Sequence, residues 1–191
     1  MAKKKKKNRL LSFIIFILIA VIIMLSAKIA YDSAINVLYP RKYSEYVEKY
    51  AAEYSLDETF LYAVIKTESS FDPDSVSSAN AVGLTQITED TFDWLLTKSG
   101  ENYTFNDLFN PEISIKYGAM FLSILMNEYN DTSTAAAAYH AGMGNVSSWL
   151  KNSEYSKDGV HLDKIPISDT AHYVSKIQKA INMYNKIYSE N

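Results

Sequence analysis

The sequence predicts a mainly α-helical domain preceded by one N-terminal transmembrane helix. Three observations support this prediction: an uncharged apolar run follows a basic cluster near the N-terminus, apolar residues beyond it recur at steps of three and four, and strand-like alternation is nearly absent. The chain of 191 residues has room for one domain of ordinary size besides that helix. Because 48% of the residues are hydrophobic and 21% are charged, the domain can bury a core.

The apolar run extends from Leu10 to Ala27 without a charged side chain and follows the basic residues Lys3–Lys7 and Arg9. As a helix it would be about 27 Å long, close to the hydrocarbon thickness of a bilayer. The competing interpretation is a cleaved signal peptide, which has an apolar region of about 7–15 residues and a small-x-small cleavage site. Leu25 breaks that site pattern before Ala27, so a retained anchor is favoured. The lysines are expected to stay cytoplasmic, which predicts a single-pass cell-membrane protein with its domain outside the cytoplasm.

This reasoning divides the chain into four parts, and Pro40 marks the entry to the folded one. They are a basic cytoplasmic tail (1–9), a transmembrane anchor (10–27), a stalk (28–40) and a folded domain (41–191).

Helices are expected in order along the folded part. The first presents an apolar and aromatic face across residues 43–54, with side chains repeating every three or four positions. Asp57 can cap the second, whose apolar stripe includes Leu61, Val64 and Ile65.

Later helices carry clearer start and stop signals. Asn110-Pro111-Glu112 combines a capping side chain, proline at the first helical position and an acid in the first turn, and this helix should run to about Asn130. A short alanine-rich helix covers 134–140, another continues through Trp149, and the last begins near Ser168 or Asp169 and runs to the C-terminus.

Composition excludes several function classes. The chain contains no cysteine, which removes disulfides, thiol nucleophiles and cysteine-ligated metals. His140, His161 and His172 do not have a metal-binding spacing, and the phosphate-binding glycine motifs are absent, so we expect no metal and no cofactor. Beyond residue 9 there are 13 basic and 22 acidic residues, and a part this acidic is not expected to bind nucleic acid.

One residue interrupts the apolar stripe of the second helix. Continuing from Leu61, Val64 and Ile65 by the same steps reaches Glu68, a carboxylate where the stripe approaches the helix end. Glu68 is either a surface acid or a side chain that points into an apolar cleft. In a cleft, desolvation would favour its neutral form and raise its pKa, as a general acid requires.

Four short segments place Glu68 in a wider pattern. They are Glu68-Ser69-Ser70-Phe71, Gly83-Leu84-Thr85-Gln86-Ile87, Ala138-Tyr139-His140-Ala141-Gly142 and Asp169-Thr170-Ala171-His172-Tyr173-Val174. In this order and spacing they resemble the signature of the SLT-type lytic transglycosylases, a family that shares its fold with goose-type lysozyme. The resemblance covers about residues 43–188 and implies a lysozyme-like helical domain with a catalytic cleft.

The chain departs from the usual family pattern at four positions. Thr85 replaces methionine, His140 replaces asparagine, Asp169 replaces glutamate, and Asn80 stands where glycine is usual. Asparagine tolerates the left-handed region, so that turn can be kept. Since Glu68 is intact, activity is expected, with altered substrate preference chiefly around His140.

The resemblance implies cleavage of the β-1,4 bond between N-acetylmuramic acid and N-acetylglucosamine in peptidoglycan. Glu68 would protonate the glycosidic oxygen and then remove a proton from the C6 hydroxyl, which closes a 1,6-anhydro ring without consuming water. The enzyme would therefore be a lyase with one catalytic carboxyl group. The neighbouring acids Asp72, Asp74, Glu89 and Asp90 are interpreted as turn and capping residues.

The other candidate site residues follow from the same resemblance. Ser77 and Gln86 match positions that line the cleft, and their alternative role is hydrogen bonding within loops. Tyr139 and Tyr173 match tyrosines near the catalytic carboxyl, with core packing as the alternative. Two further candidates for substrate contact are His140 and Ser69, and Ser69 is also suited to supporting the end of its helix.

Two other functions stay open at this point. A muramidase of the same fold would add water across the bond, and an inactive module would bind or organise the wall without turnover. The expected partners are peptidoglycan glycan strands and, through the N-terminal helix, the membrane. Cell-envelope machinery is a further partner class, of which the sequence identifies no member.

Overall fold

The computed structural model describes residues 2–188, and the chain divides into two compact units between Pro40 and Arg41. The first unit consists of α1 (Ala2–Leu38). Within it, the span Phe13–Leu38 contains an 18-residue window with a mean hydropathy of 2.9, and the span is long and apolar enough to cross a membrane. The helix continues past Ala27, so the segment predicted as a stalk is helical up to Leu38.

The second unit is built from seven α-helices and one short 3-10 helix over its described residues. Their bounds are α2 Ser44–Glu53, α3 Glu58–Ser69, α4 Glu89–Ser99, η1 Phe105–Phe109, α5 Pro111–Tyr129, α6 Thr132–Ala141, α7 Met143–Leu150 and α8 Ser168–Tyr188. Extended structure in the described part is limited to isolated antiparallel bridges of Val82 with Val76 and Ile87. The mainly α fold class predicted from the sequence is confirmed.

Capping side chains explain where three of these helices begin. Asp57 accepts a hydrogen bond from the Thr59 backbone N–H at 2.7 Å at the start of α3, and Asn110 accepts from two backbone N–H groups at the start of α5. At the start of α6 the side chain of Asp131 accepts from the backbone N–H of Thr134. This helix begins at Thr132, two residues before the predicted start at Thr134. Each carboxylate or amide oxygen satisfies an N–H that has no partner within the helix.

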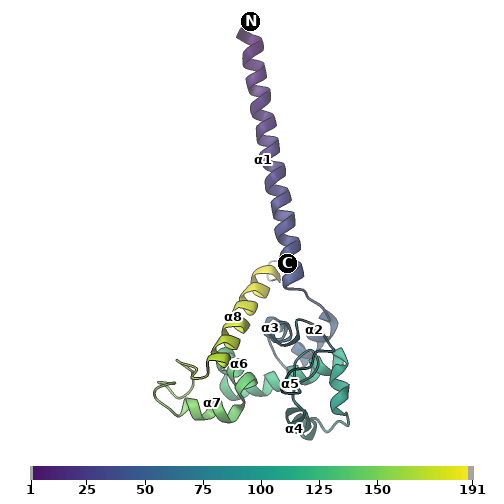
Figure 1. Ribbon diagram of the computed structural model, residues 1–191, viewed down its shortest axis with the longest axis vertical. Coiled ribbons are helices and arrows are strands. Elements are labelled where there is room, and N and C mark those ends of the chain that lie inside the picture. The colour runs from purple at the N-terminus through teal and green to yellow at the C-terminus, as the bar shows by residue number, and fades with distance from the viewer. Residues whose placement is uncertain (1, 189–191) are drawn as a thin grey trace. The chain divides into compact units, whose positions relative to one another are not determined.

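The helix α3 lies at the centre of the second unit. Its residues from Phe60 to Ile65 are all buried, and it packs most extensively against α8. In turn α8 packs against α6, and α6 against α5 (Figure 1). Tyr62 on α3 and Tyr184 on α8 are stacked with ring centroids 5.2 Å apart. This packing places the C-terminal end of α3 next to the N-terminal part of α8.

The backbone turns sharply where α3 ends. Ser70 and Phe71 have φ values of 53° and 65°, in the left-handed region that non-glycine residues seldom adopt. Phe71 is buried and packs against Tyr62, which compensates for this conformation. Glu68 is thus one residue before the end of α3, next to this turn.

Candidate active site

The carboxyl group of Glu68 is partly buried in the last turn of α3. Its Oε1 atom accepts a hydrogen bond of 2.7 Å from the phenol of Tyr173. Burial raises the pKa of Glu68 to about 7, although the hydrogen bond from Tyr173 lowers it. Near neutral pH the side chain is therefore divided between its acid and its carboxylate form, which suits a group that first donates and then accepts a proton.

Two tyrosines surround this carboxyl group, as the sequence motifs suggested. Tyr173 on α8 is buried, and burial together with the charge of Glu68 raises the pKa of its phenol well above the usual value. Tyr139 on α6 donates a hydrogen bond of 2.6 Å to the backbone carbonyl of Thr85. Its pKa is also raised well above the usual value, by burial first and by Glu68 second. Both phenols thus stay protonated and act as hydrogen-bond donors.

Ser69 connects the end of α3 to the turn that begins at Gly83. Its hydroxyl is buried, 2.9 Å from the carbonyl oxygen of Leu84 and 3.1 Å from that of Ile65. These contacts place Ser69 in support of the backbone beneath Glu68. Its assignment to substrate contact stays a prediction.

Gly83 is a position where only glycine fits. Its φ is 75°, and a Cβ atom there would lie 2.2 Å from the carbonyl oxygen of Leu108. The close approach lets the segment after Gly83 lie against η1 and α5. In this position the backbone carbonyl of Thr85 accepts the hydrogen bond from the phenol of Tyr139.

Thr85, which stands where the family usually has methionine, is fully buried against α5. Its Oγ1 donates to the carbonyl of Ser114 at 2.9 Å, and its backbone N–H donates to the Ser114 hydroxyl at 3.2 Å. Gly118 leaves the space for the Thr85 side chain, because a Cβ there would lie 2.4 Å from Thr85 Cγ2. A small polar side chain therefore fits this position, and the turn is fixed by hydrogen bonds.

The two remaining loop candidates make hydrogen bonds within their own loop. Ser77 Oγ accepts from the backbone N–H groups of Ala79 and Ala81. Gln86 Nε2 donates to the carbonyls of Ser75 and Gly83 at 2.9 and 2.8 Å. Neither side chain is hydrogen-bonded to Glu68 in the part of the chain that the structure describes, and their substrate contacts stay predictions.

His140 lies next to Tyr173 at the end of α6. The two ring centroids are 4.6 Å apart with planes tilted by 33°, and His140 Nδ1 lies 3.1 Å from the hydroxyl oxygen of Thr170. Glu68, Tyr139, Tyr173 and His140 are thus brought together from three helices, although Glu68 and Tyr173 are 105 positions apart in the chain.

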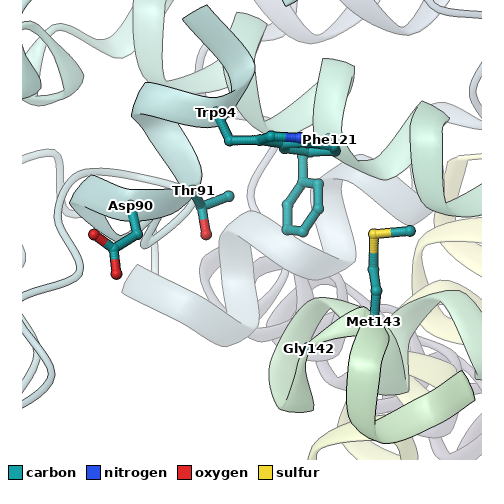
Figure 2. Close-up of a pocket in the computed structure, with 6 residues that line it drawn as sticks. All are labelled: Asp90, Thr91, Trp94, Phe121, Gly142 and Met143. Atoms are coloured by element: carbon teal, nitrogen blue, oxygen red, sulfur yellow. The ribbon is translucent and has the colours of Figure 1, made fainter. Parts of the chain in front are cut away.

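An apolar groove that the sequence did not reveal lies next to this group. It has a volume of about 290 Å³ and is lined by Asp90, Thr91, Trp94, Phe121, Gly142 and Met143. Figure 2 shows the indole of Trp94 over the ring of Phe121, and their centroids are 6.1 Å apart in an edge-to-face arrangement. Met143 extends beside them from the start of α7.

The groove and the carboxyl group share an aromatic wall. Phe121 contacts the ring of Tyr139 with centroids 5.0 Å apart, and Tyr139 is near enough to Glu68 for the carboxylate charge to raise its pKa. Five of the six lining residues belong to α4, α5 and α7, three helices that contribute no predicted site residue. Because these residues come from separate helices, only the tertiary arrangement identifies them as one groove.

The described residues contain no group of three or more histidine, aspartate or glutamate side chains arranged to hold a metal ion. Within the described chain, burial and the hydrogen bond from Tyr173 shift the pKa of Glu68. No second carboxyl group contributes to that shift.

Comparison with known proteins places this site in a family. Residues 45–161 match the Transglycosylase SLT domain, which is more than half of the chain. The chain belongs to the SLT transglycosylase family. The four motifs around Glu68, Gly83, Tyr139 and Tyr173 had suggested this membership, and it is confirmed.

Individual relatives in the SLT family share part of their length with this chain. Membrane-bound lytic murein transglycosylase C of Haemophilus influenzae is 30% identical over 163 residues, covering 73% of this chain and 46% of that protein. The protein of the same name from Yersinia pestis is 32% identical over 170 residues, covering 76% and 47%. The chain therefore spans about half the length of these curated relatives.

Solved structures of the SLT family have the same fold. Lytic transglycosylase Slt of Pseudomonas aeruginosa, solved as an inactive mutant, has a TM-score of 0.69 at 25% identity, covering 78% of this chain and 24% of that one. The 70 kDa soluble lytic transglycosylase of Escherichia coli has a TM-score of 0.69 at 24% identity, covering 78% and 25%. The predicted lysozyme-like fold is confirmed.

Proposed function

We propose that this protein is a membrane-tethered peptidoglycan lytic transglycosylase with Glu68 as its single catalytic carboxyl group. The observation that carries the proposal is the state of Glu68: a partly buried acid with a pKa of about 7, held by the phenol of Tyr173. The names of the SLT relatives, lytic murein transglycosylases, support the same reaction class.

In the first step, protonated Glu68 donates its proton to the oxygen of the β-1,4 bond between N-acetylmuramic acid and N-acetylglucosamine. The bond from the anomeric carbon to that oxygen breaks, and the alcohol leaves. The acetamido group of the substrate stabilises the positive charge that develops on the anomeric carbon. The hydrogen bond from Tyr173 stabilises the carboxylate that remains on Glu68.

In the second step, the carboxylate of Glu68 removes the proton of the C6 hydroxyl, and the C6 oxygen bonds to the anomeric carbon. This closes the 1,6-anhydro ring and returns Glu68 to its acid form, so the proton balance is restored and no water is consumed. One residue serves as acid and then as base. Glycosidases with two carboxyl groups hold the second about 5–10 Å from the first, where its negative charge would raise the pKa of the first.

We further propose that the groove beside Tyr139 receives a sugar ring of the glycan strand. The apolar side chains of Trp94, Phe121 and Met143 that line the groove can pack against the C–H surface of a pyranose, and Asp90 and Thr91 can bond to hydroxyl groups. The groove volume of about 290 Å³ is close to the lower limit of the range for small-ligand sites.

The proposed topology is single-pass, with the N-terminus cytoplasmic and the domain on the outer side. The apolar span Phe13–Leu38 and the membrane-bound relatives support association with a membrane. The basic residues before the span favour this orientation. Tethering would raise the local concentration of the domain at the wall. Protease added to intact cells should cut the domain, and a domain that stays uncut while other surface proteins are cut would reverse the orientation.

The activity test uses the full chain in detergent, incubated with purified cell walls, beside Glu68→Gln. The native protein should release soluble glycan fragments whose ends have a mass lower by one water than reducing ends, and the variant should release almost none. Reducing ends would identify a muramidase. Binding to walls without any release by the native protein would identify a non-catalytic module. Equal release by both proteins would remove Glu68 from the mechanism.

A further inference from the structure

The ring of His140 covers the residue that holds the catalytic acid. Its centroid lies 4.6 Å from that of Tyr173, whose phenol donates to Glu68 at 2.7 Å. Tyr173 is only 6% exposed, whereas His140 itself is exposed. The exposed imidazole of His140 therefore packs against the buried ring of Tyr173.

A second contact fixes the orientation of the imidazole. His140 Nδ1 lies 3.1 Å from Oγ1 of Thr170, and Thr170 is buried in the first turn of α8. Thr170 precedes Tyr173 by three residues, so both lie on the same face of α8. Turning the imidazole away would break both this hydrogen bond and the ring contact with Tyr173.

We infer that His140 is a positioning residue, which keeps the phenol of Tyr173 directed at Oε1 of Glu68. The inference rests on the proposed function, since it concerns the acid of that reaction. The asparagine usual at this position in the family has no ring to cover Tyr173. This chain thus supports its catalytic acid through an additional aromatic contact.

The influence of His140 on Glu68 passes through Tyr173. Among the described residues, the imidazole is influenced by Asp169 and contacts Tyr173, both on α8, and Tyr173 in turn interacts with Glu68 on α3 and Tyr139 on α6. Burial lowers the pKa of His140, which favours the neutral ring, while Asp169 raises it. His140 is not among the groups that shift the pKa of Glu68, whereas Tyr173 is.

The test measures the pKa of Glu68 directly, by NMR titration of its labelled side-chain carboxyl carbon in the full chain in detergent without substrate. The variants are His140→Ala, His140→Phe, Tyr173→Phe and the double variant His140→Ala/Tyr173→Phe. Because the phenol stabilises the carboxylate, Tyr173→Phe should raise the pKa of Glu68, by about one unit. His140→Ala should raise it in the same direction, and His140→Phe, which keeps a ring, should leave it close to the native value. The double variant should equal Tyr173→Phe alone.

The same proteins are then assayed on glycan strands. His140→Ala should lower kcat severalfold with little change in KM, since the residue acts on the acid and not on the sugar. A raised KM with an unchanged Glu68 pKa would instead identify His140 as a direct substrate contact and overturn the inference. The inference would also be overturned if the Glu68 pKa shifts of His140→Ala and Tyr173→Phe added together in the double variant. The titration needs no turnover, so a failure of the proposed activity is distinguished from a failure of this coupling.

Discussion

Replacing Glu68 by glutamine should stabilise the folded domain, and the gain should depend on pH. Burial raises the folded-state pKa of Glu68 from 4.5 to about 7. Between these values the folded state binds more protons than the unfolded state, so the native protein loses stability as pH rises through the folded pKa. Glutamine does not ionise, keeps an oxygen for the Tyr173 phenol and avoids this loss.

The size of the effect follows from the shift. Each pKa unit corresponds to about 1.4 kcal/mol, which gives an upper value of roughly 3 kcal/mol. Because Glu68 retains some contact with solvent, we expect about 2 kcal/mol. The stability difference between Glu68→Gln and native should thus grow by that amount from about pH 4 to about pH 8.5, in favour of the variant.

The assay is urea unfolding followed by tryptophan fluorescence across this pH range. Both tryptophans of the chain, Trp94 and Trp149, lie in the second unit, so the signal reports the domain. The matched control is Asp93→Asn, which removes one carboxylate from the exposed face of α4, and its difference from native should stay within about 0.5 kcal/mol at every pH. A difference for Glu68→Gln that is flat, or that falls as pH rises, would refute the account of a desolvated carboxyl group.

Two further substitutions test the support and the groove of the site. Gly83→Ala should destabilise the domain by about 2–4 kcal/mol in urea unfolding, because it adds a Cβ against Leu108 at a positive φ. Gly144→Ala, whose Cβ meets nothing within 4 Å, should be neutral or slightly stabilising, and equal effects of the two would contradict the close approach. Trp94→Ala should raise KM for glycan strands about three- to tenfold, and Trp94→Phe should raise it less. An unchanged KM in steady-state assays of Trp94→Ala would exclude the groove as a sugar site.

Local signals predicted the helix boundaries where a cap was present. Asp57 and the Asn110-Pro111 pair begin helices as expected, because their effects act within one turn of the chain. The extent of α4 was not predicted, since only Phe92 and Leu95 are buried in its polar sequence. Glu89 and Asp90, which were assigned to a turn or a helix start, form its first turn.

The centre of the site was predictable because the family motifs mark it. Periodicity alone left Glu68 as either a surface acid or a cleft acid, and the deciding contact comes from Tyr173, which is distant in the sequence. The groove could not be predicted in this way. Trp94, Phe121 and Met143 come from three different helices, and no short motif joins them in the sequence.

The measurement that tests the central claim most directly is digestion of purified cell walls in water labelled with a heavy oxygen isotope. If Glu68 donates and retrieves one proton while the C6 oxygen closes the ring, the released anhydro ends contain no label, and Glu68→Gln yields almost no ends. Labelled reducing ends would show that water attacks the anomeric carbon and would contradict the account.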